Sequence, residues 1–392
     1  MQNKNSLATP AGLKDYLPQE AALKRHLENK WAELFFAWGY QEVVTPSLEY
    51  YHTLTRGLGN DDLSLHKMID RNGQILALRS DMTNPIARMV ASTLQSEPWP
   101  LRFFYLANVF RYEAELQKGR QREFYQAGVE LLGAPNSWAD AEVIALAVEA
   151  LESAGLTNFE IGLGHVEITR DLLAILCEDE ERQQQLQDAL TQKNYVAVDN
   201  LLTSTSSREA RVKELITRQW RNNEIINNLQ EVADKESTLE AIAHLENVLD
   251  VLHNFGFSDK VFVDLSILRD FNYYTGIVFE GYTTKLGYPL LGGGRYNKLL
   301  QKFGFDCPAT GFALGIERVM AALPWSTKDI TKKIDYLLLG KDYSLLHSKA
   351  CELREKGYSV EIDLLGRSIA EAQKYAEKKG ISEVIEVAGE RK

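Results

Sequence analysis

The sequence predicts an α+β fold: a mainly antiparallel sheet flanked by helices, interrupted by a helical insertion and followed by a small α/β domain. Three observations predict it. Strand-like runs early in the chain are joined by connections too short for the crossovers that parallel strands need. From about 168 to 255 the sequence is rich in Gln, Glu, Asn and Leu at helical spacing. Residues 326–392 alternate strand and helix, so we expect domains at 1–325 and 326–392.

The composition is that of an ordinary globular protein. The chain has 392 residues, which suffices for two or three domains. Its net charge of −11 repels phosphate backbones, so a nucleic-acid contact would need a local basic patch. There is no apolar run of membrane-spanning length and no signal-peptide core, so we expect a cytoplasmic protein without membrane contact. Cys177, Cys307 and Cys351 lack zinc-ligand spacing, which predicts reduced thiols and no metal site.

The first element is a helix that ends at Gly39. Its apolar residues recur at steps of three and four and therefore share one face: Leu23, Leu27, Trp31, Leu34, Phe35 and Trp38. The stretch YQEVVTPSLEY follows, rich in β-branched and aromatic residues and interrupted by Pro46, which predicts an edge strand or a strand that bends. Its pattern suits a dimer contact and a simple surface strand equally well.

Three further strands are predicted by QILALRS, PLRFFYLANVFRYEAE and EFYQAGVELLG. Ser137 and Asp140 resemble a capping box at the start of the next helix, which ends at Gly155. After the insertion, strand patterns return in VFVDLSILRDFNYYTGIVFEGY and LLGGGRYNKLL, and ATGFALGIERVMAAL predicts a buried strand leading into a helix. Pro324 and the polar STKDITKK indicate a linker to the last domain.

Phosphate-binding loops and common catalytic motifs are absent from the sequence. It contains no GxxxxGK[ST], no GxGxxG after a strand, no GxSxG and no HExxH. If a nucleotide binds, charged side chains must hold it, and guanidinium groups suit phosphate oxygens. The basic candidates are Arg111, Lys118, Arg120, Arg122, Arg269 and Arg318. Most arginines are solvated surface residues, but Arg111 and Arg318 stand among apolar neighbours, where an unpaired charge is costly.

A second set of side chains suits an amino-acid ligand: Asp81, Thr83, Gln126, Glu130, Tyr273 and Tyr274. Their oxygens can accept from an ammonium group or an imidazole. Gln126 and Glu130 are four residues apart and point to one face of a strand, where Gly128 leaves room for a ligand. Taken alone, Asp81 is better explained as the cap of the following helix. His165 stands on a strand-like run and is more typical of a core histidine than of a catalytic one.

Four motifs in order resemble the histidyl form of the class II aminoacyl-tRNA synthetases. FRYEAELQKGRQREFYQ is similar to the second class II motif and GFALGIER to the third, while RDFNYYTGIVFE and GGGRYN resemble the two histidyl-specific motifs. The match runs from about residue 11 to 324. It implies a class II antiparallel sheet, a homodimer contact near EVVTPSLEY, a histidine pocket, and a C-terminal domain like a shortened anticodon-binding domain.

Two families share this fold, the histidyl-tRNA synthetases and the ATP phosphoribosyltransferase regulatory subunits. TPAGLKDYLPQEA, LRSDMTNPIARM, EFYQAGVELLG and ADAEVIALAVEAL are similar to stretches typical of the regulatory subunits. In the histidyl motif, Asp270 beside Arg269 offsets a needed positive charge, and Asn272 removes a carboxylate. Acidic and basic residues nearly balance in the C-terminal block, whereas a tRNA-reading face is expected to be basic. Arg111, Arg269 and Arg318 are retained, so ATP binding stays open.

Resemblance to the regulatory subunits implies a non-catalytic protein without a cofactor. It would form a homodimer within a hetero-oligomer with the short-form catalytic subunit, bind L-histidine as effector, and bind no tRNA. Residue by residue, the motifs imply that the ligand's amino group lies near Asp81, Thr83 and Gln126 and its imidazole near Glu130 and Tyr274. Arg269 would face its carboxylate, and Arg111 and Tyr273 complete the expected site.

Overall fold

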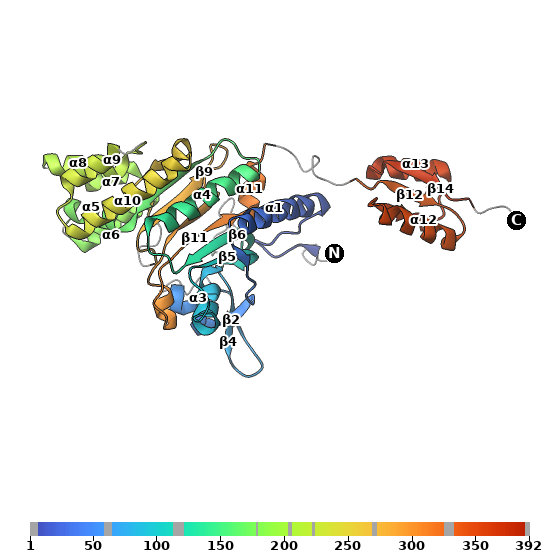
Figure 1. Ribbon diagram of the computed structural model, residues 1–392, viewed down its shortest axis with the longest axis horizontal. Coiled ribbons are helices and arrows are strands. Elements are labelled where there is room, and N and C mark those ends of the chain that lie inside the picture. Colours follow the sequence, from blue (N-terminus) through green and yellow to red (C-terminus); the bar gives the residue numbers. More distant parts are fainter. Residues whose placement is uncertain are drawn as a thin grey trace, which may run out of the picture. The chain divides into compact units, whose positions relative to one another are not determined.

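The computed structural model describes residues 7–58, 65–112, 121–177, 179–202, 206–221, 224–268, 273–324 and 333–388 (Figure 1). Within the chain, residues 1–325 and 326–392 form two compact units, each with its own core. Lys118, Arg120 and Arg269, three of the basic candidates, lie outside the described residues.

The first unit is built on an eight-stranded sheet whose strands run in the order β1-β5-β6-β11-β10-β9-β7-β8. Among the described strands, the pairs β1·β5 and β7·β8 are parallel and the other five neighbouring pairs are antiparallel, which confirms the predicted character of the sheet. In sheet order the strands are Gln41–Glu42, Leu101–Phe110, Glu123–Leu132, Ala309–Gly315, Leu291–Arg295, Ile277–Tyr282, Glu160–His165 and Val261–Val263.

Two helices, α1 (Pro18–Ala37) and α4 (Ser137–Ser153), lie side by side across the sheet (Figure 1). The Trp31 Nε1–H donates to the carbonyl of Ala150 at 2.8 Å, which joins the two helices inside the core. As predicted, α1 stops where Gly39 adopts φ +83°. The expected cap of α4 was wrong by one residue. Asn136 is the N-cap and accepts from the Ala139 amide, because its backbone is extended while that of Ser137 is already helical.

A smaller antiparallel sheet leads into α3, whose first residue is the predicted site residue Thr83. Its order is β2-β4-β3, with bounds Leu48–Tyr50, Ile75–Leu78 and Lys67–Ile69. The predicted edge strand around Pro46 is therefore two strands. β1 is an edge strand of the large sheet, next to β5, and β2 is an edge strand of the small sheet, next to β4. The helices α2 (Tyr51–Leu58) and α3 (Thr83–Thr93) pack together, and α3 follows β4 after a short turn.

The predicted helical insertion is confirmed between β7 and β8. It holds α5 (Val166–Leu176), α6 (Glu180–Thr191), α7 (Tyr195–Leu201), α8 (Ser207–Thr217), α9 (Glu224–Val232) and α10 (Glu236–Asn254). Helix α10 packs along α4, and the backbones of Trp220 and Val263 exchange two hydrogen bonds of 2.8 Å. Helix α5 begins immediately after His165, the last residue of β7, so the insertion is connected directly to the sheet.

The second unit is a βαβαβ domain. Its strands β12 (Tyr336–Leu339), β13 (Val360–Ile362) and β14 (Glu383–Glu386) are parallel, in the order β13-β12-β14. Helix α12 (Tyr343–Glu355) packs against Leu338 on one face, and α13 (Ile369–Lys379) packs against Leu337 and Leu339 on the other. Successive side chains of β12 thus point to opposite faces of the sheet and contact the helix on each face, as the alternating strand and helix pattern predicts.

In the described part of the chain, no helix combines the length and apolarity needed to cross a membrane. Cys177, Cys307 and Cys351 form no disulfide with one another in the described structure, and the first two are buried. The described residues also contain no cluster of three or more His, Cys, Asp or Glu side chains able to hold a metal ion.

Candidate functional site

Glu130 is the centre of the site. It lies on β6, is 2% exposed, and has a hydroxyl hydrogen bond at each carboxyl oxygen. Thr83 at the start of α3 donates to Oε1 at 2.7 Å, and Tyr296, just beyond β10, donates to Oε2. Three elements distant in sequence therefore meet at this one side chain. Two of the predicted site residues, Thr83 and Glu130, are in direct contact.

The Glu130 carboxyl is held in an unusual protonation state. Burial raises its pKa from the ordinary 4.5 to about 8, although the Thr83 and Tyr296 hydroxyls act in the opposite direction. The nearby Asp81 charge raises the pKa further. In the described structure no Lys, Arg or His side chain is hydrogen-bonded to this carboxyl. Such a group is largely protonated at pH 7 and becomes a carboxylate when a cation or strong donor reaches it.

Glycines on three neighbouring strands make room for this arrangement. A Cβ on Gly311 would lie 2.2 Å from Glu130 Oε2, and one on Gly294 would lie 2.9 Å from the Tyr274 ring. Gly128 serves a different purpose from the one predicted. A Cβ there would lie 2.4 Å from the hydroxyl oxygen of Tyr105, so the space beside Gly128 is filled by a buried tyrosine and is not left for a ligand.

Tyrosines form the wall beside Glu130. The Tyr273 ring stacks on Tyr296 with centroids 5.3 Å apart and meets Tyr274 edge-on at 4.8 Å. Burial raises the pKa values of Tyr105, Tyr273 and Tyr296 well above the ordinary 10, and the Glu130 charge adds to this, so the phenols stay protonated. Of these, the sequence reasoning missed Tyr105 and Tyr296. Tyr296 could have been found, because it stands in GGGRYN, a motif that the resemblance singled out.

Asp81 and Gln126 differ in how far they are already engaged. Asp81 Oδ1 accepts from the Asn84 amide at 2.8 Å, and Oδ2 accepts from the Asn84 side-chain nitrogen at 3.0 Å. Asp81 therefore bonds the first turn of α3, as the alternative interpretation expected, although the N-cap position itself is Met82, one residue later. In contrast, the Oε1 atom of Gln126 is buried without a hydrogen-bond partner in the described structure. Buried acceptors are normally satisfied, so this atom is suited to receive a donor from a ligand.

The two arginines expected in apolar surroundings have different environments. Arg111 is exposed: its Nε donates to the Ser80 carbonyl at 3.0 Å and its guanidinium lies 5.6 Å from the Phe124 ring centroid. The expectation was wrong for Arg111 because this residue comes just after Phe110, the last residue of β5. Arg318 is half-buried, donates to the Pro289 carbonyl at 2.7 Å and lies over the Tyr288 ring.

Glu317, beside Arg318, accepts hydrogen bonds from both the segment before α1 and β6. Its Oε1 accepts from the Tyr125 amide at 2.8 Å and from the Tyr16 hydroxyl. The Arg122 amide donates to the carbonyl of Gly12 at 2.8 Å. Residues before α1 are thereby held along the base of the hairpin. Sequence reasoning missed this role, since Tyr16 and Glu317 are separated by almost the whole first unit.

A second buried polar cluster lies where α4, α10 and β10 meet, and sequence reasoning did not find it. Asp140, 1% exposed, accepts from Arg295 Nε at 2.9 Å and lies 3.1 Å from His244 Nε2. Burial would raise the pKa of Asp140, but these two partners outweigh it and the pKa is lowered. His165 is buried nearby, 6.1 Å from the His244 ring, and burial lowers its pKa to about 3. It is therefore a neutral core histidine, as the strand pattern indicated.

Comparisons with known proteins agree with this arrangement. The family model described as histidyl-tRNA synthetase matches residues 12–319. The ATP phosphoribosyltransferase regulatory subunit of Moorella thermoacetica is 43% identical over 385 residues, 97% of this chain and 98% of that protein. A crystal structure from Bacillus halodurans, described as an ATP phosphoribosyltransferase regulatory subunit/histidyl-tRNA synthetase, matches with TM-score 0.85 and 34% identity, covering 98% of this chain and 99% of that one.

A histidyl-tRNA synthetase from Nostoc shares the fold with TM-score 0.79 at 21% identity, covering 96% of this chain and 90% of that one. The match to regulatory subunits extends over nearly the full length of both proteins and at higher identity. The chain therefore belongs to the ATP phosphoribosyltransferase regulatory subunits, a family of non-catalytic subunits with the histidyl-tRNA synthetase fold.

Proposed function

We propose that this protein assembles with the short-form catalytic subunit of ATP phosphoribosyltransferase, supports the first step of L-histidine biosynthesis, and relays feedback inhibition by histidine. The Glu130 carboxyl is the observation that supports a role for this protein as the histidine sensor of the complex. It is buried, ringed by tyrosines and threonine, and lacks a cationic partner among the described residues. A buried carboxyl without a cation is costly to the fold, which supports a ligand as its missing partner.

In the proposed complex, an imidazole N–H of histidine donates to Glu130, with Tyr274 along the ring. The α-ammonium group donates to the unpartnered Oε1 of Gln126 and to Asp81. Thr83 supports Glu130 through its hydroxyl, so its contribution to the ligand is partly indirect. We assign Arg269, which lies outside the described residues, to the ligand carboxylate on the histidyl motif alone. Tyr273 supports Tyr274 through their edge-on contact. Arg111, exposed just after β5 and hydrogen-bonded to the Ser80 carbonyl, completes the proposed site.

Coupling between histidine and the catalytic subunit must be reciprocal. If histidine lowers the activity of the complex by favouring one state of the assembly, that state must bind histidine more tightly than the other state does. Binding also couples to protons. The Glu130 pKa of about 8 falls when a donor binds, so histidine binding releases a proton near neutral pH and tightens as the pH rises from 7 to 8.

We also propose that the protein forms a homodimer within the hetero-oligomer, through the region of β1 and β2. Apolar side chains there are unusually exposed: Val44 is 84% exposed, and Ile69, on β3 of the same small sheet as β2, is 75% exposed. Exposed apolar side chains of this size are typical of protein interfaces. We propose that no tRNA binds, since the acidic and basic residues of the C-terminal unit nearly balance.

The deciding experiment measures phosphoribosyl-ATP formation by a purified short-form catalytic subunit, with and without this protein, at increasing histidine concentration. We expect a large rate increase that histidine reverses. The variant Glu130→Gln should still activate but should need at least about tenfold more histidine, because a charge-assisted hydrogen bond contributes roughly 1.5 to 3 kcal/mol. Glu152→Gln, an exposed carboxyl on α4, is the matched control and should behave as the native protein.

Each part of the proposal can fail separately. No activation of the cognate catalytic subunit, together with histidine-dependent charging of tRNA, would reject the regulatory role. Activation that histidine does not reverse, with no histidine binding by calorimetry, would reject the sensor and leave the assembly role. Equal histidine sensitivity of native protein and Glu130→Gln would move the sensor away from this site.

A further inference from the structure

The helical insertion contains a cavity of about 150 Å³, well separated in sequence from Glu130. Helices α5, α9 and α10 enclose it. Aliphatic side chains make most of its wall, namely Ile168, Leu172 and Ile175 from α5, Leu229 from α9 and Ile242 from α10. For comparison, an engineered cavity of the same volume lined by apolar side chains binds benzene. The space therefore suits a body of about six non-hydrogen atoms.

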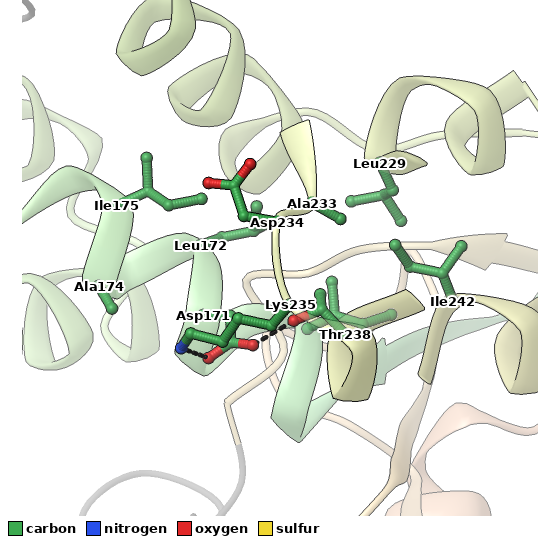
Figure 2. A pocket seen from close by; sticks show the side chains of 11 residues that line it. Asp171, Leu172, Ala174, Ile175, Leu229, Ala233, Asp234, Lys235, Thr238 and Ile242 are labelled. Carbon is green, nitrogen blue, oxygen red and sulfur yellow. Dashed lines mark hydrogen bonds and ion pairs between the residues drawn. The ribbon is translucent and has the colours of Figure 1, made fainter. Parts of the chain in front are cut away.

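One end of the cavity is polar, and its charges are already paired. Figure 2 shows Lys235 and Thr238 both reaching Asp171. The Lys235 ammonium donates to Asp171 Oδ1 at 2.6 Å, and the Thr238 hydroxyl donates to Oδ2. The carboxylate of Asp234 points away from this group (Figure 2) and pairs with Arg208. The polar end is thus close to neutral in total charge.

The hydrogen-bonding capacity at this end determines which ligand fits. Asp171 accepts only, and the Thr238 oxygen keeps acceptor capacity after donating its proton. Lys235 has three N–H donors, only one of which faces Asp171 Oδ1. A hydroxyl can donate to Asp171 or Thr238 and accept from Lys235. A ligand ammonium would meet the Lys235 ammonium, and a ligand carboxylate would meet Asp171, so either charge is opposed.

We propose that this cavity is a second small-molecule site, selective for a neutral aliphatic or monocyclic body that carries a single hydroxyl group. Branched aliphatic walls and the lack of an aromatic side chain among the lining residues favour a compact branched body. The site is independent of the histidine pocket, because no residue lines both.

The test uses the full chain and 3-methylbutan-1-ol, followed by saturation-transfer NMR and by chemical shifts of the isoleucine methyl groups. We expect saturable binding with a millimolar dissociation constant. Two charged molecules with the same body, 3-methylbutylamine and 3-methylbutanoate, should bind at least about tenfold more weakly. Methanol, which has the hydroxyl without the body, should show no saturable binding.

Three substitutions test whether the alcohol binds in this cavity. Ala174 lies on its exposed rim, so Ala174→Phe should block the mouth without disturbing the core and should abolish binding. Ala243→Phe places the same ring on the exposed face of α10 away from the cavity and should leave binding unchanged. Thr238→Val keeps the shape and removes the hydroxyl, and should weaken binding several-fold.

Four results would overturn the proposal. They are no saturable binding of the alcohol, binding that survives Ala174→Phe, equal binding of the amine or the carboxylate, and displacement of the alcohol by histidine. The last result would place the alcohol in the Glu130 site. Since the assay needs neither the catalytic subunit nor histidine inhibition, its outcome is separate from that of the sensor proposal.

Discussion

Two buried carboxyl groups of this protein, Glu130 and Asp140, have opposite electrostatic environments. Both are almost fully shielded from water, at 2% and 1% exposure. Asp140 is hydrogen-bonded to the cationic Arg295 and to His244, and its pKa is lowered despite burial. Among the described residues, Glu130 has two hydroxyl partners and no cationic one, and burial raises its pKa to about 8.

The difference distinguishes a structural carboxylate from one kept for a ligand. Asp140 carries its counter-charge within the chain, so its charge is satisfied as soon as α4, α10 and β10 come together. Glu130 is satisfied only as a neutral acid until a donor arrives. A fold tolerates one such group where function requires it, and perturbed carboxyls of this kind concentrate at functional sites.

The largest effect is expected from Asp140→Asn, which tests the structural half of the comparison. Removing the charge leaves the guanidinium of Arg295, only 3% exposed, without its counter-ion. Breaking a buried ion pair in this way costs about 3 to 5 kcal/mol of unfolding free energy. Urea unfolding followed by circular dichroism measures it, with Glu152→Gln on the same helix as control. A loss below about 1 kcal/mol would show that Asp140 is dispensable.

A second effect follows from the close contact between Gly311 and Glu130. In Gly311→Ala, the new Cβ would lie 2.2 Å from Glu130 Oε2 and 2.4 Å from the Val129 carbonyl oxygen, so strands must shift. Overpacking of this kind costs about 1 to 3 kcal/mol, and we expect histidine binding to be lost as well. Gly287→Ala is the control, since a Cβ there meets no atom within 4 Å. Equal behaviour of the two variants would contradict the packing argument.

The third prediction concerns the pH dependence of stability. Because the folded pKa of Glu130 is raised above its unfolded value, its contribution to stability is complete below about pH 4.5 and is lost as the pH rises through 8. In that window it lowers the unfolding free energy by at most about 1.4 kcal/mol per pH unit. Glu130→Gln should therefore lose less stability between pH 5 and 8 than the native protein does. Parallel stability curves for the two proteins would show that the carboxyl is not perturbed.

The smallest effect is expected from Tyr296→Phe, which removes one hydroxyl from Glu130 and leaves the ring stacked on Tyr273. The lost hydrogen bond should cost about 1 kcal/mol. Since this bond lowers the Glu130 pKa, its loss should shift the pH-dependent fall in stability to higher pH. Tyr195→Phe, on an exposed part of the insertion, should change neither quantity. An unshifted pH profile would mean that the Tyr296 hydroxyl does not act on Glu130.

Most of the fold could be predicted because its signals are local. Hydrophobic periodicity and turn residues a few positions apart predict helix α1, the β5–β6 hairpin, the insertion and the C-terminal βαβαβ unit. The error at the start of α4 was also local: Asn136 and Ser137 are both good capping residues, and only the backbone angles decide between them.

The site was harder to predict because its partners are far apart in sequence. Gly128 was assigned to a ligand, since the sequence does not reveal that Tyr105 lies opposite it across the hairpin. The Asp140 cluster joins residues 155 positions apart, and the cavity in the insertion exists only once three helices have packed. Arg111 is exposed because β5 ends just before it, and the apolar residues next to it in sequence do not show where that strand ends.

The contact between Tyr16 and Glu317 also has a consequence for the order of folding. Its two residues are 301 positions apart, so it closes after nearly all of the first unit has been synthesised. Contacts of such long range form late, because the loop that they close carries a large entropic cost. The bond therefore cannot form before the segment that carries Glu317 has been synthesised, so its formation shows that a newly made chain has joined the two ends of the first unit.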